Sequence, residues 1–466
     1  MMKKSFTWGL AAAISLATAC TQADTLHETY LLALENDHQL KADEARYRAG
    51  LEAKVIGRSA LLPQVTATAR YSETEYDSTG FSTTPTPGNR TSNIENDTES
   101  YSVSLTQPLF NMAAWFGYKQ GQSLSDVATA QFSADQQSLI IRVSEAYFNV
   151  LSGVDNLETA MAEENALSHQ LEQTRQRFEV GLTAITDVHE AQAAYDTAVA
   201  TTLEARGNLG IAFEQLEVLT GKSSDTVAPL VETFPVTKPE PLARHEWVDF
   251  AVKNNYNLKV AKFNSEASRQ NARAKTSAHL PTLTGSYSYT DREDSNTDFT
   301  SAGVTFPADS RTDDNKTIAI QLDVPIFSGL RTSGERRQAH EEYMQNQELY
   351  NQAQRDTIQA ARSLHLSVVT DVAQVKARKQ ATVSNQSALE ATQAGYEVGT
   401  RNLVDVLVAQ RSLYQAQRNY DTSRYEYILN MLRLKEVAGN LTPEDILKLN
   451  QWLDESKQVS REQFEK

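Results

Sequence analysis

The sequence is nearly free of cysteine: of 466 residues only Cys20 carries a thiol, and it lies close to the N-terminus. The segment 1–23 has the basic start and apolar middle of a secretory signal peptide, which is shorter than a spanning helix and differently flanked. We expect cleavage before Asp24; the alternative is lipoprotein processing at Cys20, with Ala17 three positions before it. Cleavage before Asp24 would leave no thiol, so packing or assembly must stabilise the mature chain in place of disulfides.

Long apolar runs are also missing. After the signal segment no stretch approaches the ~20 apolar residues of a membrane helix, so a membrane part would have to consist of β-strands. The eight histidines show no metal-ligand spacing, and no phosphate-binding loop or Gly-x-Ser-x-Gly turn occurs. The sequence therefore gives little support to an enzyme and indicates no cofactor. The formal charge of −16 argues against nucleic acid as a partner.

What the sequence does contain is one unit present twice. Four strings recur at an offset of 218 positions (281 minus 63, for Pro281 and Pro63), and a fifth, at Pro108 and Pro325, recurs at 217. The four strings of the first half are Ala33-Leu34-Glu35-Asn36, Ser59-Ala60-Leu61-Leu62-Pro63, Phe178-Glu179-Val180-Gly181 and Asp187-Val188. Their counterparts are Ala251-Val252-Lys253-Asn254, Ser277-Ala278-His279-Leu280-Pro281, Tyr396-Glu397-Val398-Gly399 and Asp405-Val406. We therefore predict two halves of one fold.

Each half is predicted to begin with helix, over about 26–60 in the first half, and to continue with two strands. The predicted strands are about 64–76 and 98–108, then about 282–291 and 316–325. Their apolar and polar side chains alternate, which is typical of a barrel strand between lipid and water; the alternative is a sandwich strand facing a soluble core. The polar segments between the strands, Ser78–Asp97 and Glu293–Asn315, predict long loops without regular structure.

A long helical hairpin is predicted after the strands of each half, over about 111–219 and about 328–438. Apolar positions of its first helix step by three and four, which indicates an amphipathic helix with coiled-coil character. These positions are Leu139, Ile140, Val143, Tyr147, Val150, Leu151, Val154 and Leu157. Turns are expected at Val180-Gly181-Leu182 and at Val398-Gly399-Thr400, where the glycines suit a positive φ.

Four strands cannot close on themselves, and an open sheet edge in lipid leaves backbone groups unsatisfied. Because closure needs roughly eight strands, and a water-filled bore more, the chain must assemble through its sheet edges. This argument allows two to four copies. Three copies would give twelve strands and twelve helices.

Longer strings resemble the outer-membrane efflux protein family, the outer membrane factors, over almost the whole mature chain. The strings of the first half are Ser59-Ala60-Leu61-Leu62-Pro63-Gln64, Glu145-Ala146-Tyr147-Phe148-Asn149-Val150-Leu151 and Gln176-Arg177-Phe178-Glu179-Val180-Gly181-Leu182, followed by Ala184-Ile185-Thr186-Asp187-Val188. In the second half the string runs from Ala394-Gly395-Tyr396 to Val406-Leu407.

The resemblance implies a mixed α and transmembrane β fold. Each protomer would supply four strands and long coiled-coil helices to a homotrimer, in which a twelve-stranded β-barrel continues into a twelve-helix α-barrel tunnel with an equatorial domain. The signal peptide would be 1–23, the structural repeats 24–230 and 246–438, and the equatorial segments 231–245 and 439–466.

The function implied is that of a gated passive exit duct in tripartite efflux pumps or type I secretion systems, carrying drugs, other small molecules or proteins. The protein would lie in the outer membrane of a Gram-negative bacterium, in contact with outer-membrane lipid, with a large periplasmic part. Its partners would be a periplasmic adaptor (membrane fusion) protein and an inner-membrane transporter of the RND, MFS or ABC class. The alternative function is a non-conducting periplasmic coiled-coil tether, which would not need four alternating strands.

The same resemblance implies a gate at the periplasmic tip of the tunnel. Its matching residues here are Gln170, Thr186, Asp187, Tyr396 and Arg401. Arg401 can hold Asp187 and Thr186 together, and the phenol of Tyr396 can donate to the same carboxylate.

The pore constriction would be Asp405, where a ring of carboxylates favours cations and can bind a blocking metal ion, although no metal is required. Val408 stands where a second aspartate is usual in the family, and Gln393 replaces an acidic residue. The alternative reading of Asp187 and Asp405 is as helix N-caps. The adaptor would contact the hairpin tips at Val180, Gly181, Leu182, Val398, Gly399 and Thr400.

Overall fold

The computed structural model describes residues 25–82, 88–223, 226–296, 299–301, 304–454, 456–457 and 459–460. The predicted signal peptide and Cys20 lie outside the described residues. The chain forms two compact units. Of the described residues, those up to Lys41, those of Gln137–Trp247 and those from Arg362 onward form the hairpin unit, and those of Ala42–Gln136 and Val248–Ala361 form the sheet unit.

The same order of elements occurs in both halves of the sequence. The helices of the described residues are α1 (Leu26–Asn36), α2 (His38–Ser59), α3 (Met112–Glu179), α4 (Ile185–Thr220), α5 (Arg244–Asn254), α6 (Tyr256–Ser277), α7 (Arg331–Glu397), α8 (Leu403–Val437) and α9 (Pro443–Asn450). The strands are β1 (Gln64–Ser82), β2 (Gly88–Phe110), β3 (Thr226–Val227), β4 (Thr282–Asn296), β5 (Phe299–Ser301), β6 (Val304–Phe306), β7 (Asp309–Asp323) and β8 (Val459–Ser460). None of the helices in these ranges is both long and apolar enough to cross a membrane.

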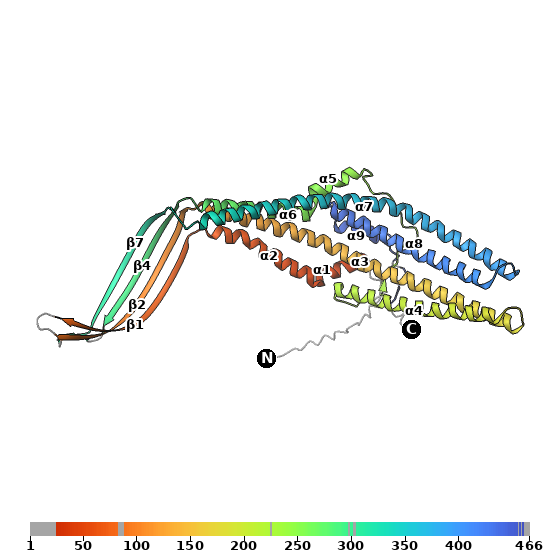
Figure 1. Ribbon diagram of the computed structural model, residues 1–466, viewed down its shortest axis with the longest axis horizontal. Coiled ribbons are helices and arrows are strands. Elements are labelled where there is room, and N and C mark those ends of the chain that lie inside the picture. Colours follow the sequence, from red (N-terminus) through yellow and green to blue (C-terminus); the bar gives the residue numbers. More distant parts are fainter. Residues whose placement is uncertain are drawn as a thin grey trace, which may run out of the picture. The chain divides into compact units, whose positions relative to one another are not determined.

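The sheet unit contains four long antiparallel strands in the order β1-β2-β4-β7, which lie side by side in Figure 1. Val65, Leu105, Tyr287 and Ile318 are successive partners across the four strands, so their side chains form one row on one face. Val65 and Ile318 are 66% and 82% exposed. A sandwich strand would bury such a face against a second layer, so the exposure of this row disagrees with the soluble-core alternative.

The strands run further than the sequence pattern predicted. The expectation that Ser78–Asp97 and Glu293–Asn315 are loops without regular structure was wrong, because β1, β2, β4 and β7 extend into both segments. The polar side chains there do not alternate with apolar ones. The strands continue because each has a neighbour whose backbone N–H and C=O groups pair with its own. The polarity of the side chains does not predict this backbone pairing.

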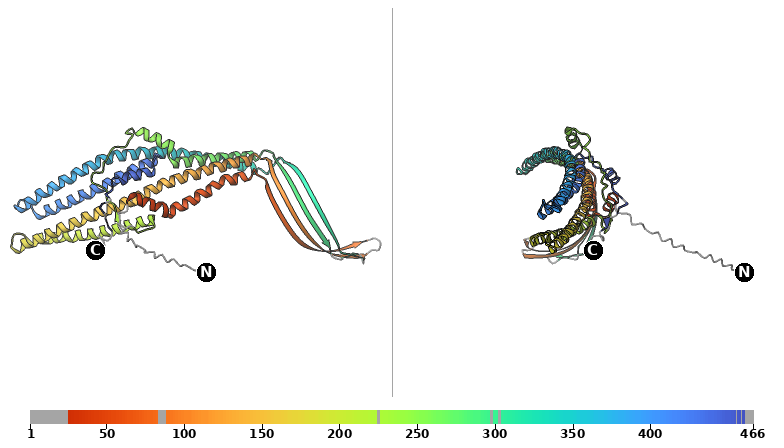
Figure 2. Two further views of the ribbon diagram at one scale, coloured as in Figure 1. Left: turned by 180° about the vertical axis from the view of Figure 1, so that it is seen from behind. Right: turned by 90° about the vertical axis from the view of Figure 1, so that its right-hand side faces the viewer.

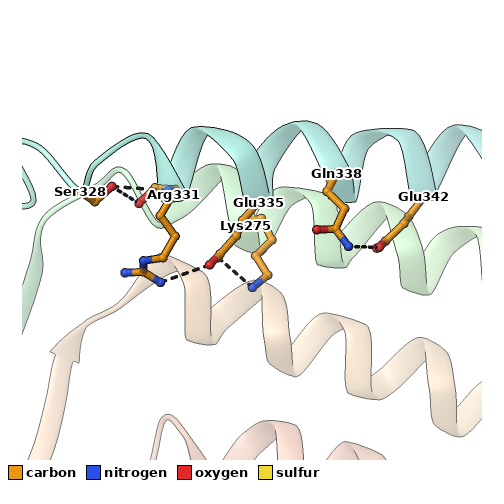
Figure 3. A network of polar contacts seen from close by, with 7 residues as sticks. Lys275, Ser328, Arg331, Glu335, Gln338 and Glu342 are labelled. Carbon is orange, nitrogen blue, oxygen red and sulfur yellow. Dashed lines mark hydrogen bonds and ion pairs between the residues drawn. The ribbon is translucent and has the colours of Figure 1, made fainter.

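Helices of the sheet unit pack along one another with ionic and aromatic contacts. Glu335 of α7 accepts hydrogen bonds from Lys275 of α6 at 3.1 Å and from Arg331, one turn away on α7, at 3.2 Å (Figure 3). The rings of Tyr47 in α2 and Phe132 in α3 stack with their centroids 4.9 Å apart.

The helical stretch predicted over about 26–60 consists of two helices. α1 ends and α2 begins at Asp37, whose side chain accepts the backbone N–H groups of Gln39 and Leu40 at 3.2 Å. In the second half Asn255 separates α5 from α6 and accepts the N–H of Leu258 at 2.8 Å. Asp37 and Asn255 are 218 positions apart (255 minus 37), so the helix break is part of the repeat.

The hairpin unit holds two helical hairpins. One is α4 with the part of α3 from Gln137 onward, and the other is α8 with the part of α7 from Arg362 onward; the helices of each run along one another in the left view of Figure 2. The amphipathic face predicted for α3 is confirmed, since the eight apolar positions from Leu139 to Leu157 are all buried. Tyr147 is fully buried there, and its hydroxyl donates to the carbonyl of Ala228 at 2.7 Å and accepts the N–H of the same residue at 3.2 Å.

The segment after α4 and the C-terminal segment pair with one another. β3 and β8 form a two-stranded antiparallel sheet in which Val227 faces Val459, and Leu230 forms a further bridge with Leu453. The short helix α9 begins at a capping box formed by Thr442 and Asp445. Backbone pairing therefore joins two segments that lie more than two hundred positions apart in the sequence.

Candidate functional site

The two hairpin tips are built by the same turn. Gly181 and Gly399 have φ of 76° and 77°, which confirms the predicted positive φ. The N–H of Leu182 donates to the carbonyl of Arg177, and that of Thr400 to the carbonyl of Gly395, both at 2.8 Å. This is the hydrogen-bond pattern of a Schellman cap, which satisfies the last carbonyls of α3 and α7.

The predicted adaptor-contacting residues are all exposed: Val180, Gly181, Leu182, Val398, Gly399 and Thr400. Val180 and Val398 are 70% and 75% exposed, and Leu182 is 69% exposed. Each tip therefore presents apolar side chains that the chain itself does not cover.

The interpretation of Asp187 and Asp405 as N-caps was wrong. The N-cap residues of α4 and α8 are Ala184 and Asn402, and both aspartates occupy the third helical position. Asn402 and Asp405 form a capping box, in which the Asp405 N–H donates to Asn402 Oδ1 at 2.8 Å. Each aspartate lies in a first helical turn, where the helix dipole favours its charge.

The predicted bonds of Arg401 and Tyr396 to Asp187 are not formed within the chain. Arg401 lies 3.8 Å from Asp405, one turn away on its own hairpin, and the Arg401 side chain remains 62% exposed. Asp187 accepts a hydrogen bond from the hydroxyl of Thr183, and Thr186 is exposed. Arg401 and Thr186 therefore have surface left for a second molecule.

Tyr396 is buried between the two hairpins rather than bonded to a carboxylate. Only 8% exposed, it belongs to an apolar cluster that draws on both hairpins. The other buried members are Leu171, Ala191, Leu389, Leu403 and Val406. Within the described ranges the Tyr396 hydroxyl has no hydrogen-bond partner, and the Arg177 guanidinium of α3 lies 4.7 Å from the Tyr396 ring centroid.

The remaining predicted positions are spread along the helices. Gln170 is buried on α3, where its amide donates to Thr174 Oγ1 of the same helix at 3.4 Å. Val408 is 54% exposed on α8, and Gln393 is half-buried on α7. The structure thus brings together Arg401 with Asp405, and it does not bring Gln170 to the other predicted gate residues.

Further from the tips, α3 and α8 are joined by a series of polar contacts. Arg433 Nη2 lies 2.6 Å from Glu145 Oε1, and Arg418 Nη1 lies 3.0 Å from Glu163 Oε2. The hydroxyl of Tyr414 donates to the carbonyl of Ala162 at 3.2 Å. These contacts fix the spacing of the two hairpins from Glu145 to Glu163.

A polar cavity of about 720 Å³ interrupts this series, bordered by α3, α7, α8 and residues 229–232. Inside it the Tyr425 hydroxyl donates to Asp155 Oδ2 at 2.6 Å, and Arg424 Nη2 donates to the carbonyl of Val231 at 2.6 Å. Burial, and then the charge of Asp155, raise the pKa of Asp421 to about 6. Burial also raises the pKa of Asp155, against the opposing effects of Tyr425 and Arg424.

Sequence reasoning missed Arg177 and the acidic cavity. Asp155 follows Val154 directly in the buried stripe of α3, so a carboxylate at the margin of an apolar face was a visible signal. No comparable signal singled out Arg177. In the part of the chain that the structure describes, no group of three or more His, Cys, Asp or Glu side chains could hold a metal ion.

The chain matches a known protein family in both of its halves. The profile of the family described as outer membrane efflux protein matches residues 29–222 and again residues 247–440, which begin 218 positions apart (247 minus 29). The offset equals that of the internal repeat.

Individual proteins are similar over nearly the full chain. Outer membrane protein TolC of Vibrio cholerae is 35% identical over 98% of this chain and 100% of its own length. Alkaline protease secretion protein AprF of Pseudomonas aeruginosa is 29% identical over 96% of this chain and 90% of its own. The crystal structure of the outer membrane protein VceC of Vibrio cholerae has a TM-score of 0.74 and 18% identity, covering 89% of this chain and 96% of that one, which shows the shared fold. The chain therefore belongs to the outer membrane efflux protein family, and it is an outer-membrane channel for efflux and type I secretion.

Proposed function

We propose that three copies of the chain form one passive exit duct: a twelve-stranded β-barrel in the membrane, continued by a tunnel of twelve helices in the periplasm. The observation that carries this proposal is the sheet of the single chain. β1 and β7 each have one neighbour among the long strands, so each has an open edge. A row of apolar side chains on one face is exposed at the same time.

Assembly resolves both features. Joining β1 of one copy to β7 of the next pairs the free backbone groups, which would cost several kcal/mol each if left open in lipid. Outer-membrane lipid would then cover the apolar row. With four long strands per copy, two, three or four copies would close a barrel of eight, twelve or sixteen strands. Twelve strands leave room for a water-filled bore and make a smaller barrel than the largest porins.

The two segments joined by β3 and β8 would form the equatorial domain of this assembly. They comprise residues 231–245 with the chain just before them, and residues 439–466, of which 455, 458 and 461–466 lie outside the described residues. Pairing of Val227 with Val459 supports this proposal, because it joins the two segments to each other.

The tunnel would be gated at the hairpin tips by residues of neighbouring copies. Arg401 and Thr186 are exposed and Asp187 is half-buried, so a carboxylate and a guanidinium are available to meet across an interface between copies. Gln170 and Tyr396, which are buried, would contribute to the gate within each copy. Three copies of Asp405 would form the constriction, where a carboxylate ring favours cations.

The partners would be a periplasmic adaptor protein and an inner-membrane transporter of the RND, MFS or ABC class. The exposed apolar tips support the first of these, because uncovered side chains such as Val180 and Val398 suit contact with another helical protein. The cargo would be drugs, other small molecules or proteins, and the transporter would supply the energy.

Single-channel conductance in planar bilayers tests the duct and its gate. We expect a low, cation-preferring conductance for the wild type and a clear rise for Arg401→Ser, because the guanidinium is lost from the tip. Arg411→Ser, which removes an exposed arginine further along α8, is the matched control and should leave the conductance unchanged. Asp405→Asn should reduce the cation preference, measured as a shift of the reversal potential in a salt gradient.

The outcomes separate the parts of the proposal. An unchanged conductance with Arg401→Ser would refute the gate and keep the duct. Folded trimers that never conduct would refute the duct and leave a periplasmic tether as the function.

A further inference from the structure

The hairpins of one protomer are held together differently near their tips than elsewhere. In the described residues, every hydrogen bond and ion pair between α3 and α8 lies at or before Glu163 on α3. From there to the end of α3 at Glu179 the two hairpins meet through the apolar cluster around Tyr396. Because apolar contacts do not depend on direction, the two hairpins can shift against each other more easily in this stretch than along the polar contacts from Glu145 to Glu163.

One charged side chain joins the hairpins inside that stretch. Arg177 lies in the last turn of α3, where a cation is favoured by the helix dipole. Its guanidinium lies 4.7 Å from the ring centroid of Tyr396 on α7. A cation within about 6 Å of an aromatic ring is attracted to the ring face, and more strongly when the pair is shielded from water. Tyr396 is 8% exposed, and Arg177 is half-buried.

The hydrogen bonding of the pair points the same way. In the described ranges neither the Tyr396 hydroxyl nor Arg177 Nε has a hydrogen-bond partner. The neighbouring Arg175 differs, since its guanidinium donates to Gln192 Oε1 at 2.6 Å within its own hairpin. Arg177 is thus the arginine of this turn that crosses to the second hairpin, and the crossing uses the ring of Tyr396 rather than its hydroxyl.

We propose that Arg177 is a further gate residue, a positioning residue that clamps the ring of Tyr396 and so holds the two hairpins of one protomer at the closed spacing. The proposal rests on the proposed gate and adds to it a contact within the protomer. Opening separates Arg177 from Tyr396, and the guanidinium then gains water in place of the ring. Interactions of this kind shift an equilibrium by about threefold to about thirtyfold, from exposed to shielded pairs.

The test compares the conductance of variants that remove the cation, the ring or only the hydroxyl. We expect Arg177→Gln and Tyr396→Leu each to raise the open probability by about threefold or more. Tyr396→Phe keeps the ring and should give a clearly smaller rise than Tyr396→Leu. Arg175→Gln removes the same charge from the same turn without crossing to the second hairpin, and it should behave as the wild type.

The pairing itself is tested by the double variant. If Arg177 and Tyr396 act through each other, Arg177→Gln combined with Tyr396→Leu opens the channel no more than the larger single effect. Additive effects would overturn the clamp. Equal rises for Tyr396→Phe and Tyr396→Leu would assign the link to the hydroxyl and also overturn it, as would Arg177→Gln behaving like Arg175→Gln.

A second measurement keeps the test independent of the duct. Spin labels at Val180 and Val398, both exposed, report the spacing of the tips by pulsed electron resonance. We expect Arg177→Gln to broaden or lengthen the distance distribution and Arg175→Gln to leave it as in the wild type. A distance distribution that Arg177→Gln leaves unchanged overturns the clamp even if no variant conducts. A conductance that only Arg401→Ser leaves unchanged refutes the proposed contact between copies and does not affect the clamp.

Discussion

The buried carboxylate Asp421 should make the stability of the hairpin unit depend on pH. Its pKa is about 6 in the folded chain and 3.8 ordinarily, so the folded state binds its proton more tightly than the unfolded state. The resulting penalty is absent below 3.8, grows as the pH rises, and is complete above about 6. At about 1.4 kcal/mol for each pKa unit, the upper limit is about 3 kcal/mol.

Solvent reduces this limit, because the Asp421 carboxyl is only partly buried. We therefore expect Asp421→Asn, which cannot ionise and can still accept the hydrogen bond from Gln417, to raise the free energy of unfolding by about 1–2 kcal/mol at about pH 8. At about pH 4 the gain should nearly vanish, since both side chains are then uncharged in the folded state.

Chemical unfolding followed by circular dichroism at the two pH values measures this difference. Glu204→Gln, at an exposed position of α4, is the control for loss of a negative charge and should show no such pH dependence. A gain for Asp421→Asn that is equal at both pH values, or larger in acid, would show that Asp421 is not held above its ordinary pKa.

Two further substitutions, one in each unit, test the packing. Tyr147→Phe should lower the free energy of unfolding by about 2 kcal/mol, because the buried N–H and C=O of Ala228 both lose a partner; a loss below about 0.5 kcal/mol in chemical unfolding would contradict this. Gly121→Ala should destabilise the sheet unit by about 1–3 kcal/mol, since its Cβ would lie 2.4 Å from the carbonyl oxygen of Ala53. Gly117→Ala meets nothing within 4 Å and should be neutral or stabilising, so melting temperatures that rank the two variants the other way would be decisive.

Much of the architecture could be predicted from sequence because it depends on local periodicity. Steps of three and four identify the buried face of α3, and glycines flanked by long helices identify the turns at Gly181 and Gly399. Alternation of apolar and polar side chains identifies four strand segments, at about 64–76, 98–108, 282–291 and 316–325. The offset of 218 then transfers each assignment from one half to the other, as Asp37 and Asn255 illustrate for the helix break.

The site residues divide differently. The sequence located the hairpin tips and the aspartates in the first turns after them, since a turn and a helix start are local features. It misjudged their bonding: Asp405 completes a capping box with Asn402, and Asp187 accepts from Thr183. Which partner each aspartate bonds depends on small differences between side-chain distances within one turn. Residue type alone does not predict such differences.

The sequence by itself determined the repeat, the order of strands and helical hairpins, and the apolar stripe that holds the hairpin unit together. Only the tertiary structure decided how far the strands extend, where Asp155 and Asp421 meet in one cavity, and that Arg177 lies over the ring of Tyr396. The reason is physical. Periodicity records which face of an element leaves water, whereas strand length and side-chain pairing depend on what a distant segment places opposite that face.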